Sequence, residues 1–174
     1  NYRNVVTTPA VSPDGTRLAF TTFVEGQPKI YIHSLETGRK LTFYNQEASL
    51  NMTPDFLPDG KSLIYASSMA GPTQLYQVDL DGRNLRRISY SRTIDVDPVV
   101  NPKTGSQIAF TSGRSGVPQI YLMDLDGANV RKRIGFRLLS ELIIVQGQHP
   151  EIFQEIIQLH ADGLKVLAVQ EPDV

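Results

Sequence analysis

Short segments in which apolar and polar residues alternate run through residues 5–134 and are separated by turn residues. Pro-Asp-Gly at 58–60 and Asp-Gly at 81–82 are typical of tight turns, because they set or tolerate the backbone angles that such turns need. Between these turns the alternation predicts an antiparallel meander. Its four strands are expected near 53–56, 62–67, 74–79 and 86–89.

The meander occurs three times. Leu18, Leu63 and Ile108 hold equivalent positions, and the interval from each to the next is 45 residues. A second marker, an aliphatic residue followed by tyrosine, keeps the same interval at 30–31, 75–76 and 120–121. A period of about 45 residues with four strands predicts β-propeller blades, because packing around an axis buries both apolar faces of each sheet. We therefore expect a mainly β fold of three four-stranded antiparallel blades.

The repeated motifs resemble those of a known family. Ser-Pro-Asp-Gly-x-x-Leu-Ala-Phe at 12–20, Ile-Tyr at 30–31 and Asp-Leu-Asp-Gly at 79–82 are similar to the repeats of TolB, the periplasmic propeller protein of the Tol-Pal envelope system. The resemblance covers roughly residues 5–134. It implies half of a six-bladed propeller, a periplasmic location, and a protein partner such as the peptidoglycan-associated lipoprotein Pal.

The repeat ends after Arg133, where no further Pro-Asp-Gly turn appears. Pro150, an apolar helical face and Asp-Gly at 162–163 predict a helix, and the apolar run 164–169 predicts a strand after it. We therefore divide the chain into three blades at 1–134 and a strand-helix-strand segment of unrecognised family at 135–174. The apolar helix residues expected to contribute to contact with a second copy are Ile152, Phe153, Ile156 and Ile157.

Composition and charge exclude several classes of function. The chain is 40% hydrophobic and 20% charged with a net charge of −1, which gives no bulk field to attract nucleic acid or an anionic membrane. The longest apolar runs, such as 142–145, are too short to span a bilayer. There is no cysteine, so disulfides and thiolate chemistry are excluded. We expect no nucleic-acid partner and no membrane insertion.

Residues suited to catalysis do not gather in the sequence. His33, His149 and His160 are far apart and lack the spacing of a metal-ligand pair, and the loop at 113–116 lacks the Gly-x-Ser-x-Gly of a nucleophile elbow. We therefore expect no catalytic, cofactor or metal site. Aspartates beside turn glycines are expected to bond the backbone, and basic residues at the blade edges to be solvated. The turn aspartates are Asp14, Asp59, Asp81 and Asp126.

Loops held rigidly around a propeller axis are suited to docking another protein, which makes a binding scaffold the leading hypothesis. The candidate contact residues are those expected just before the innermost strands, and Asp95 and Asp97 are expected to approach the central channel. The full set is Thr7, Asn51, Met52, Thr93, Asp95 and Asp97.

Three blades leave two terminal faces without neighbours, which favours a homodimer, with capping by the C-terminal segment as the other solution. Two further hypotheses stay open for function. One is the propeller portion of a hydrolase resembling prolyl oligopeptidases, without its catalytic domain. The other is an artificial or chimeric fragment, favoured by the abrupt change after Arg133 and by a start at Asn1 with neither Met nor a leader, which predicts a processed or excised chain.

Overall fold

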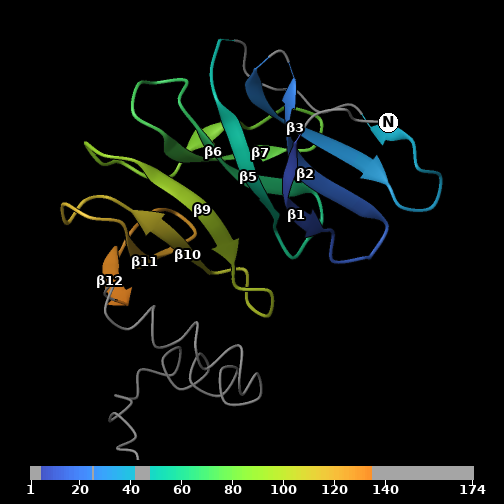
Figure 1. The fold of residues 1–174 in the computed structure, drawn as a ribbon. Coiled ribbons are helices and arrows are strands. Elements are labelled where there is room, and N and C mark those ends of the chain that lie inside the picture. The colour runs from blue at the N-terminus through green and yellow to red at the C-terminus, as the bar shows by residue number, and fades with distance from the viewer. Residues whose placement is uncertain (1–4, 25, 42–47, 135–174) are drawn as a thin grey trace, which may run out of the picture. The chain divides into compact units, whose positions relative to one another are not determined.

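The computed structural model describes residues 5–24, 26–41 and 48–134. Within these ranges the chain forms twelve strands in three sheets of four, each with antiparallel neighbours in sequence order (Figure 1). The first sheet holds β1 (Val6–Val11), β2 (Arg17–Val24), β3 (Gln27–Ser34) and β4 (Lys40–Leu41). The second holds β5 (Asn51–Phe56), β6 (Ser62–Ser67), β7 (Gln74–Asp79) and β8 (Arg86–Arg87). The third holds β9 (Asp95–Val100), β10 (Gln107–Ser112), β11 (Gln119–Asp124) and β12 (Arg131–Ile134).

The predicted mainly β fold of three blades is confirmed. The strands expected at 62–67 and 74–79 match β6 and β7 residue for residue, and the marker residues Leu18, Leu63 and Ile108 each lie on the second strand of a blade. The chain divides into two units, Asn1–Arg133 and Ile134–Val174. Apart from Ile134, the second unit lies outside the described residues, and so do its predicted helix and the four contact residues Ile152, Phe153, Ile156 and Ile157.

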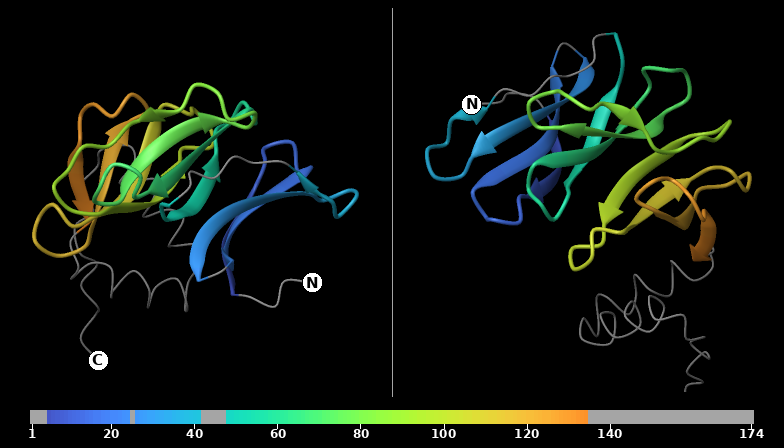
Figure 2. Two further views of the ribbon diagram at one scale, coloured as in Figure 1. Left: turned by 90° about the horizontal axis from the view of Figure 1, so that it is seen from above. Right: turned by 180° about the vertical axis from the view of Figure 1, so that it is seen from behind.

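The second blade packs one face on the first blade and the other face on the third blade, and the three sheets follow one another in this order in two further views (Figure 2). Between the first and second blades, an aromatic face of the second blade meets an aliphatic face of the first. The aliphatic face carries Ala19, Ile30 and Ile32, and the aromatic face carries Phe56, Leu63, Tyr65, Tyr76 and Val78.

The contact between the second and third blades repeats this arrangement. Aliphatic residues of the second blade, such as Ile64 and Leu75, meet the third blade's Phe110 and Tyr121 in one buried cluster. Phe110 and Tyr121 have ring centroids 6.1 Å apart, close to the 6.2 Å between Tyr65 and Tyr76 at the equivalent place in the second blade. At both blade boundaries, therefore, an aromatic face of one blade packs on an aliphatic face of the blade before it.

The turns contain the backbone hydrogen bonds expected of their aspartates. The Asp59 Oδ1 accepts from the Lys61 amide at 2.8 Å, and the other three turn aspartates accept from the amide two residues ahead in the same way. In the third blade, Gly127 has φ of +90°. A Cβ at Gly127 would collide with the backbone oxygen of Ile88 in the second blade, so this turn rests directly on its neighbour.

Candidate functional site

The innermost strands β1, β5 and β9 lie side by side and are interrupted at one equivalent point each (Figure 1). There the pairing with the next strand slips, and the residue at the slip has a left-handed φ of 50° at Thr8, 52° at Thr53 and 52° at Asp97. Proline follows in every case. A bulge of this kind bends the strand and frees backbone groups from the ladder. These three bulges surround a hollow of about 320 Å³.

Hydrogen bonds connect the bulges from blade to blade. The Thr53 amide donates to Thr21 Oγ1 of the first blade at 2.9 Å, and the Asp97 amide donates to Thr53 Oγ1 of the second blade at 3.3 Å. Thr21 Oγ1 also lies 2.7 Å from Thr8 Oγ1. The amides of Thr53 and Asp97 do not pair within their own sheets at the bulges. Each donates instead to a threonine hydroxyl of the preceding blade. This chain of contacts fixes the wall of the hollow.

Two carboxylates line the hollow. Asp55 Oδ2 accepts from the Val100 amide of the next blade at 2.7 Å, and burial raises the pKa of Asp55 although its hydrogen bonds act against that shift. Asp97 is more exposed, and partial desolvation raises the pKa of its carboxyl as well. Of these two acids, Asp97 is the one whose side chain is available to a partner in the hollow.

The predicted contact residues have unequal positions. The sequence placed them before the innermost strands, but all except Thr93 lie within those strands. Thr7 is exposed, and Met52 is half-buried against the core between the second and third blades. Asn51 is fully buried and its Oδ1 accepts from Ser67 Oγ at 3.1 Å. Its equivalent in the third blade is Asp95, which is also fully buried.

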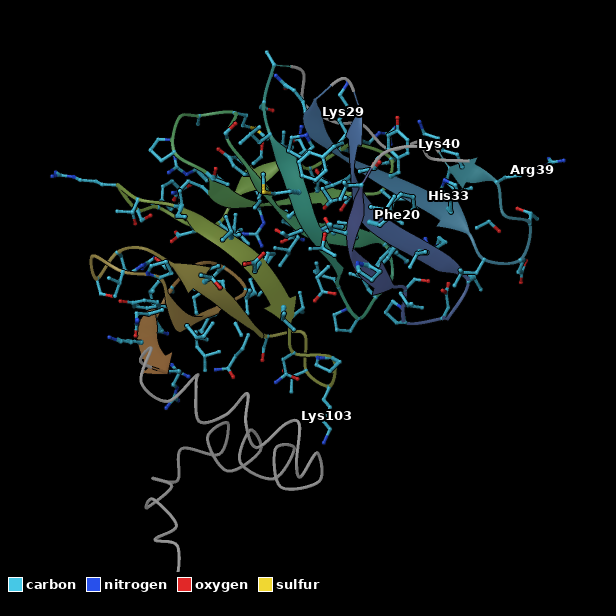
Figure 3. All side chains as sticks on the ribbon, in the orientation of Figure 1. Phe20, Lys29, His33, Arg39, Lys40 and Lys103 are labelled. Carbon is cyan, nitrogen blue, oxygen red and sulfur yellow. The ribbon has the colours of Figure 1, made fainter. Side chains whose placement is uncertain are left out.

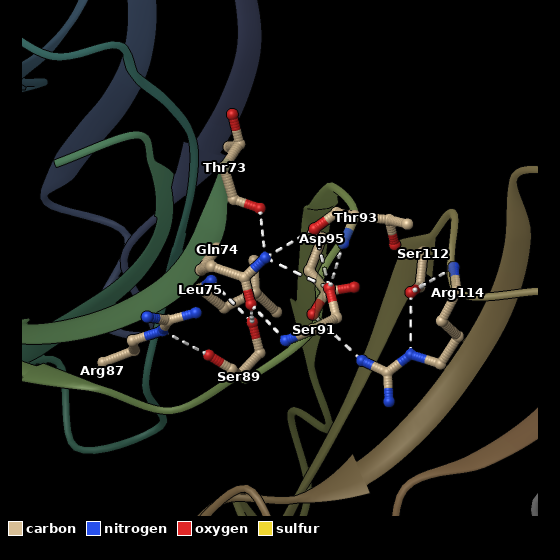
Figure 4. A network of polar contacts seen from close by, with 10 residues as sticks. All are labelled: Thr73, Gln74, Leu75, Arg87, Ser89, Ser91, Thr93, Asp95, Ser112 and Arg114. Carbon is tan, nitrogen blue, oxygen red and sulfur yellow. Dashed lines mark hydrogen bonds and ion pairs between the residues drawn. The ribbon is translucent and has the colours of Figure 1, made fainter. Parts of the chain in front are cut away.

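Asp95 is held by an ion pair instead of facing the channel. Arg114 Nη2 lies 3.0 Å from Asp95 Oδ2 (Figure 4). The Arg114 guanidinium also stacks on Phe110 and Tyr121. Ser112 Oγ accepts from Arg114 Nε at 2.8 Å and joins the same network. A buried carboxylate needs such compensation. The structural role of Asp95 was not visible in the sequence, because its partner Arg114 lies nineteen residues away, between β10 and β11.

Thr93 belongs to the connection between the second and third blades. Its carbonyl oxygen accepts from Gln74 Nε2 at 2.6 Å, and Gln74 Oε1 in turn accepts from the Ser91 amide at 2.8 Å (Figure 4). Ser91 Oγ donates to the same Thr93 carbonyl at 2.7 Å. One buried glutamine therefore fixes this connection.

Thr8 and Thr53, which make the bulges of the first two blades, were not among the residues predicted from the sequence. A signal was present: a polar residue followed by proline recurs as Thr-Pro at 8–9, Thr-Pro at 53–54 and Asp-Pro at 97–98. A proline inside an otherwise regular strand pattern indicates a bulge or an edge. Because this dipeptide recurs in all three blades, it could have located the wall of the hollow.

His33 and Lys40, two side chains of types that can serve in catalysis, make aromatic contacts on the first blade. The His33 ring centroid is 5.3 Å from that of Phe20 on the neighbouring strand, and Lys40 Nζ lies 3.6 Å from the centre of the Tyr31 ring (Figure 3). In the described ranges, no three acidic or histidine side chains are grouped closely enough to hold a metal ion. Nor do those ranges contain a helix of the length and apolar character that crossing a membrane requires.

Curated relatives are similar to part of this chain in sequence. A protein TolB homolog from Chlorobaculum tepidum is 37% identical over 89 residues, which is 51% of this chain and 20% of the relative. The Tol-Pal system protein TolB of Bordetella pertussis is 41% identical over 46% of this chain and 28% of the relative. The matched part is therefore between a fifth and a third of the length of these relatives.

Solved structures share the fold. TolB from Acinetobacter baumannii superposes with a TM-score of 0.67 and 31% identity, over 78% of this chain and 34% of that one. A puromycin hydrolase superposes with a TM-score of 0.58 at 19% identity, which shows the propeller fold alone. Residues 1–146 match the TolB beta propeller domain. The resemblance of the three repeats is thereby confirmed, and the chain belongs to the TolB beta propeller domain family.

Proposed function

We propose that the chain is a non-enzymatic scaffold that binds a protein partner at the hollow between its innermost strands, and that this partner is a Pal-like lipoprotein in the periplasm. The observation that carries the proposal is the rigid wall of the hollow with the exposed carboxyl of Asp97 on it. Relatives named as Tol-Pal system proteins support the choice of partner. A preorganised wall favours binding because little ordering entropy is lost on docking.

The structure reduces the set of residues for direct contact. Thr7 and Asp97 are exposed and remain candidates, together with the edge of Met52 and with Thr93. Asn51 and Asp95 are fully buried, so we propose that they act by holding the strands from which the contact residues project. Reversal of the charge at Asp95 would therefore test folding and not docking.

The test is a calorimetric titration of the chain with the soluble part of a Pal-type lipoprotein. Asp97→Lys should weaken binding about tenfold, because a positive charge replaces the negative carboxylate at the docking face. Arg86→Glu is the matched charge reversal at a blade edge and should leave the affinity within about twofold. A larger loss from Arg86→Glu than from Asp97→Lys would contradict the assignment of the hollow as the docking face.

We also propose that the chain has no hydrolytic activity of its own. The support is the use of His33 in ring packing and of the turn aspartates in backbone hydrogen bonds. Incubation of the purified chain with peptide and ester substrates is the test. Saturable turnover that follows the protein through purification would overturn this part of the proposal and favour the hydrolase hypothesis.

The assembly we propose is a homodimer, with Ile152, Phe153, Ile156 and Ile157 contributing to the contact between copies. These residues lie outside the described part of the chain. The support within the described part is the packing of an aromatic face on an aliphatic face at both blade boundaries, a contact that a second copy of the chain can continue. Light scattering coupled to size-exclusion chromatography measures the number of copies directly.

A further inference from the structure

The innermost strands of the second and third blades begin in the same way but differ in one side chain. In the second blade the Ser68 amide donates to the Leu50 carbonyl oxygen at 3.2 Å. In the third blade the Gly113 amide donates to the Ile94 carbonyl oxygen at 3.0 Å. Gly113 therefore holds the place of Ser68, one interval of 45 residues further along the chain. The backbone contact is the same, and the third blade lacks the hydroxymethyl group of serine at this place.

In the second blade the serine hydroxyl takes part in the hydrogen bonds at the start of β5. Ser68 Oγ accepts from the Leu50 amide at 2.9 Å. The next residue, Asn51, uses both ends of its side chain, because its Nδ2 donates to the Ser49 carbonyl oxygen at 3.1 Å and its Oδ1 accepts from Ser67 Oγ at 3.1 Å. Groups of the protein itself therefore satisfy the polar atoms of this buried side chain.

The third blade has different polar atoms at the equivalent places. Asp95 stands where the second blade has Asn51, and Thr93 stands where it has Ser49. Where Asn51 has a donor, Asp95 therefore has a second acceptor. Asp95 Oδ2 accepts from Arg114 Nη2, but Asp95 Oδ1 and Thr93 Oγ1 are buried and have no hydrogen-bond partner among the described residues. A buried carboxylate oxygen without a donor is costly, so a donor is expected at this place.

Gly113 lies next to both of these residues. A Cβ built on Gly113 would be 3.4 Å from Thr93 Oγ1, which is an ordinary van der Waals distance. Ser112, which precedes Gly113, pairs with Asp95 across β10 and β9. The side chains of Thr93, Asp95 and Ser112 form one group next to Arg114 (Figure 4). The backbone at Gly113 therefore stands far enough from Thr93 to admit one small group between them.

We propose that one buried water molecule binds between Gly113, Thr93 and Asp95 and does there what the Ser68 hydroxyl does in the second blade. Its oxygen accepts from the Ile94 amide, as Ser68 Oγ accepts from the Leu50 amide. Its two hydrogens are donated to Asp95 Oδ1 and Thr93 Oγ1. Buried water in proteins typically makes about three hydrogen bonds to polar groups that are otherwise unpaired, and this place offers that number of partners.

The charges around the site favour water over a metal cation. The Asp95 carboxylate already has a positive partner, the Arg114 guanidinium at 3.0 Å. A metal ion would add a second positive charge beside that guanidinium in a buried place, with no carboxylate left to balance it. Calcium also takes about six or more oxygen ligands, whereas the unpartnered side-chain oxygens here are those of Asp95 and Thr93. A neutral molecule with two hydrogens fits both the charge and the partners.

The experiment compares crystal structures of the full chain and of Gly113→Ser at a resolution that shows ordered water. In the wild type we expect a water oxygen within hydrogen-bond distance of Asp95 Oδ1, Thr93 Oγ1 and the Ile94 amide nitrogen. In Gly113→Ser the new hydroxyl should replace that water and accept from the Ile94 amide. The φ of Gly113 is outside the left-handed region, so a side chain here does not strain the backbone. Gly113→Ala is the matched control, because its methyl group displaces the water and offers no hydroxyl. Its equilibrium constant of folding should be about tenfold lower than that of Gly113→Ser.

A measurement in solution checks the same site. Oxygen-17 relaxation dispersion of the solvent counts water molecules that stay long in a folded protein, and this count should be lower by one in Gly113→Ser. Ser115→Ala, an exposed change between β10 and β11, should leave the count as in the wild type. A wild-type structure without water at this place, or with a metal ion there, overturns the proposal. Equal counts for the wild type and Gly113→Ser overturn it as well. None of these results bears on binding of the lipoprotein, which the titration measures.

Discussion

Replacing Gly127 by alanine should lower the free energy of unfolding through two separate effects. The first is conformational, because φ at Gly127 is +90°, a left-handed angle that costs a residue with a Cβ about 1 kcal/mol. The second is steric, because the new Cβ would collide with the backbone oxygen of Ile88, and backbone cannot turn aside as a side chain can. Overpacking of this kind costs about 1 to 3 kcal/mol, so we expect a total loss of about 2 to 4 kcal/mol.

Gly116 provides the control that separates the conformational effect from the steric effect. Its φ is +93°, and nothing lies within 4 Å of a Cβ built there. Gly116→Ala should therefore lose only the conformational part, about 1 kcal/mol. The free energy of unfolding is measured by urea denaturation at one fixed protein concentration, because any association would add a concentration-dependent term.

The contact is tested by the difference in the free energy of unfolding between Gly127→Ala and Gly116→Ala. If Gly127→Ala loses no more stability than Gly116→Ala, the third blade's turn does not rest on the second blade as described. A larger loss at Gly127 with an unchanged dependence on urea concentration would locate the effect in the native contact between the blades.

Three further changes test other contacts. Thr21→Val should cost about 1 to 2 kcal/mol, because the Thr53 amide loses the hydroxyl to which it donates. Arg114→Met should cost on the order of 3 kcal/mol, since the fully buried carboxylate of Asp95 is left without its cation. Asp79→Asn should make the free energy of unfolding fall less steeply as the pH is lowered. Hydrogen bonds lower the pKa of Asp79, so the stability it contributes is present above the ordinary value of 3.8 and is lost as pH falls through the lower pKa of the folded state.

Each of these changes has a control or a contrary result. Thr111→Val replaces the threonine equivalent to Thr21 in the third blade, and the described residues give its hydroxyl no hydrogen bond, so this variant should cost less than Thr21→Val. Arg114→Lys keeps the charge and should recover part of the loss seen with methionine. If the free energies of unfolding of Asp79→Asn and wild type decrease in parallel from pH 7 down to about pH 3, the assigned hydrogen bonds are contradicted.

The fold could be predicted from the sequence because the repeat is local and regular. Alternation, turn glycines and the interval of 45 residues each depend on near neighbours in the chain, and together they located β6 and β7 correctly. The turn aspartates were predictable for the same reason. Each bonds an amide two residues ahead, which sequence spacing alone can indicate.

The candidate site could be predicted only in part, because its geometry depends on contacts between blades. The burial of Asp95 depends on Arg114, nineteen residues away, and the burial of Asn51 depends on Ser67, sixteen residues away. A left-handed angle at a β-branched residue such as Thr8 or Thr53 is also uncommon, and the propensity of threonine alone does not indicate it. The exposed Asp97 was predicted to approach the channel, and it lines the hollow.

The short outer strands have a consequence for solubility. In β4 and β8 only two residues are paired, and the outermost strands carry Lys40, Arg86, Arg87, Arg131, Lys132 and Arg133. A long neutral edge offers its free amides and carbonyls to any extended chain and so promotes aggregation, whereas a short basic edge repels a second copy of itself. The inner edges are protected differently, by a bulge and a proline in each strand. Growth of the sheets strand by strand is therefore disfavoured at both edges, which leaves faces and loops as the routes for specific association.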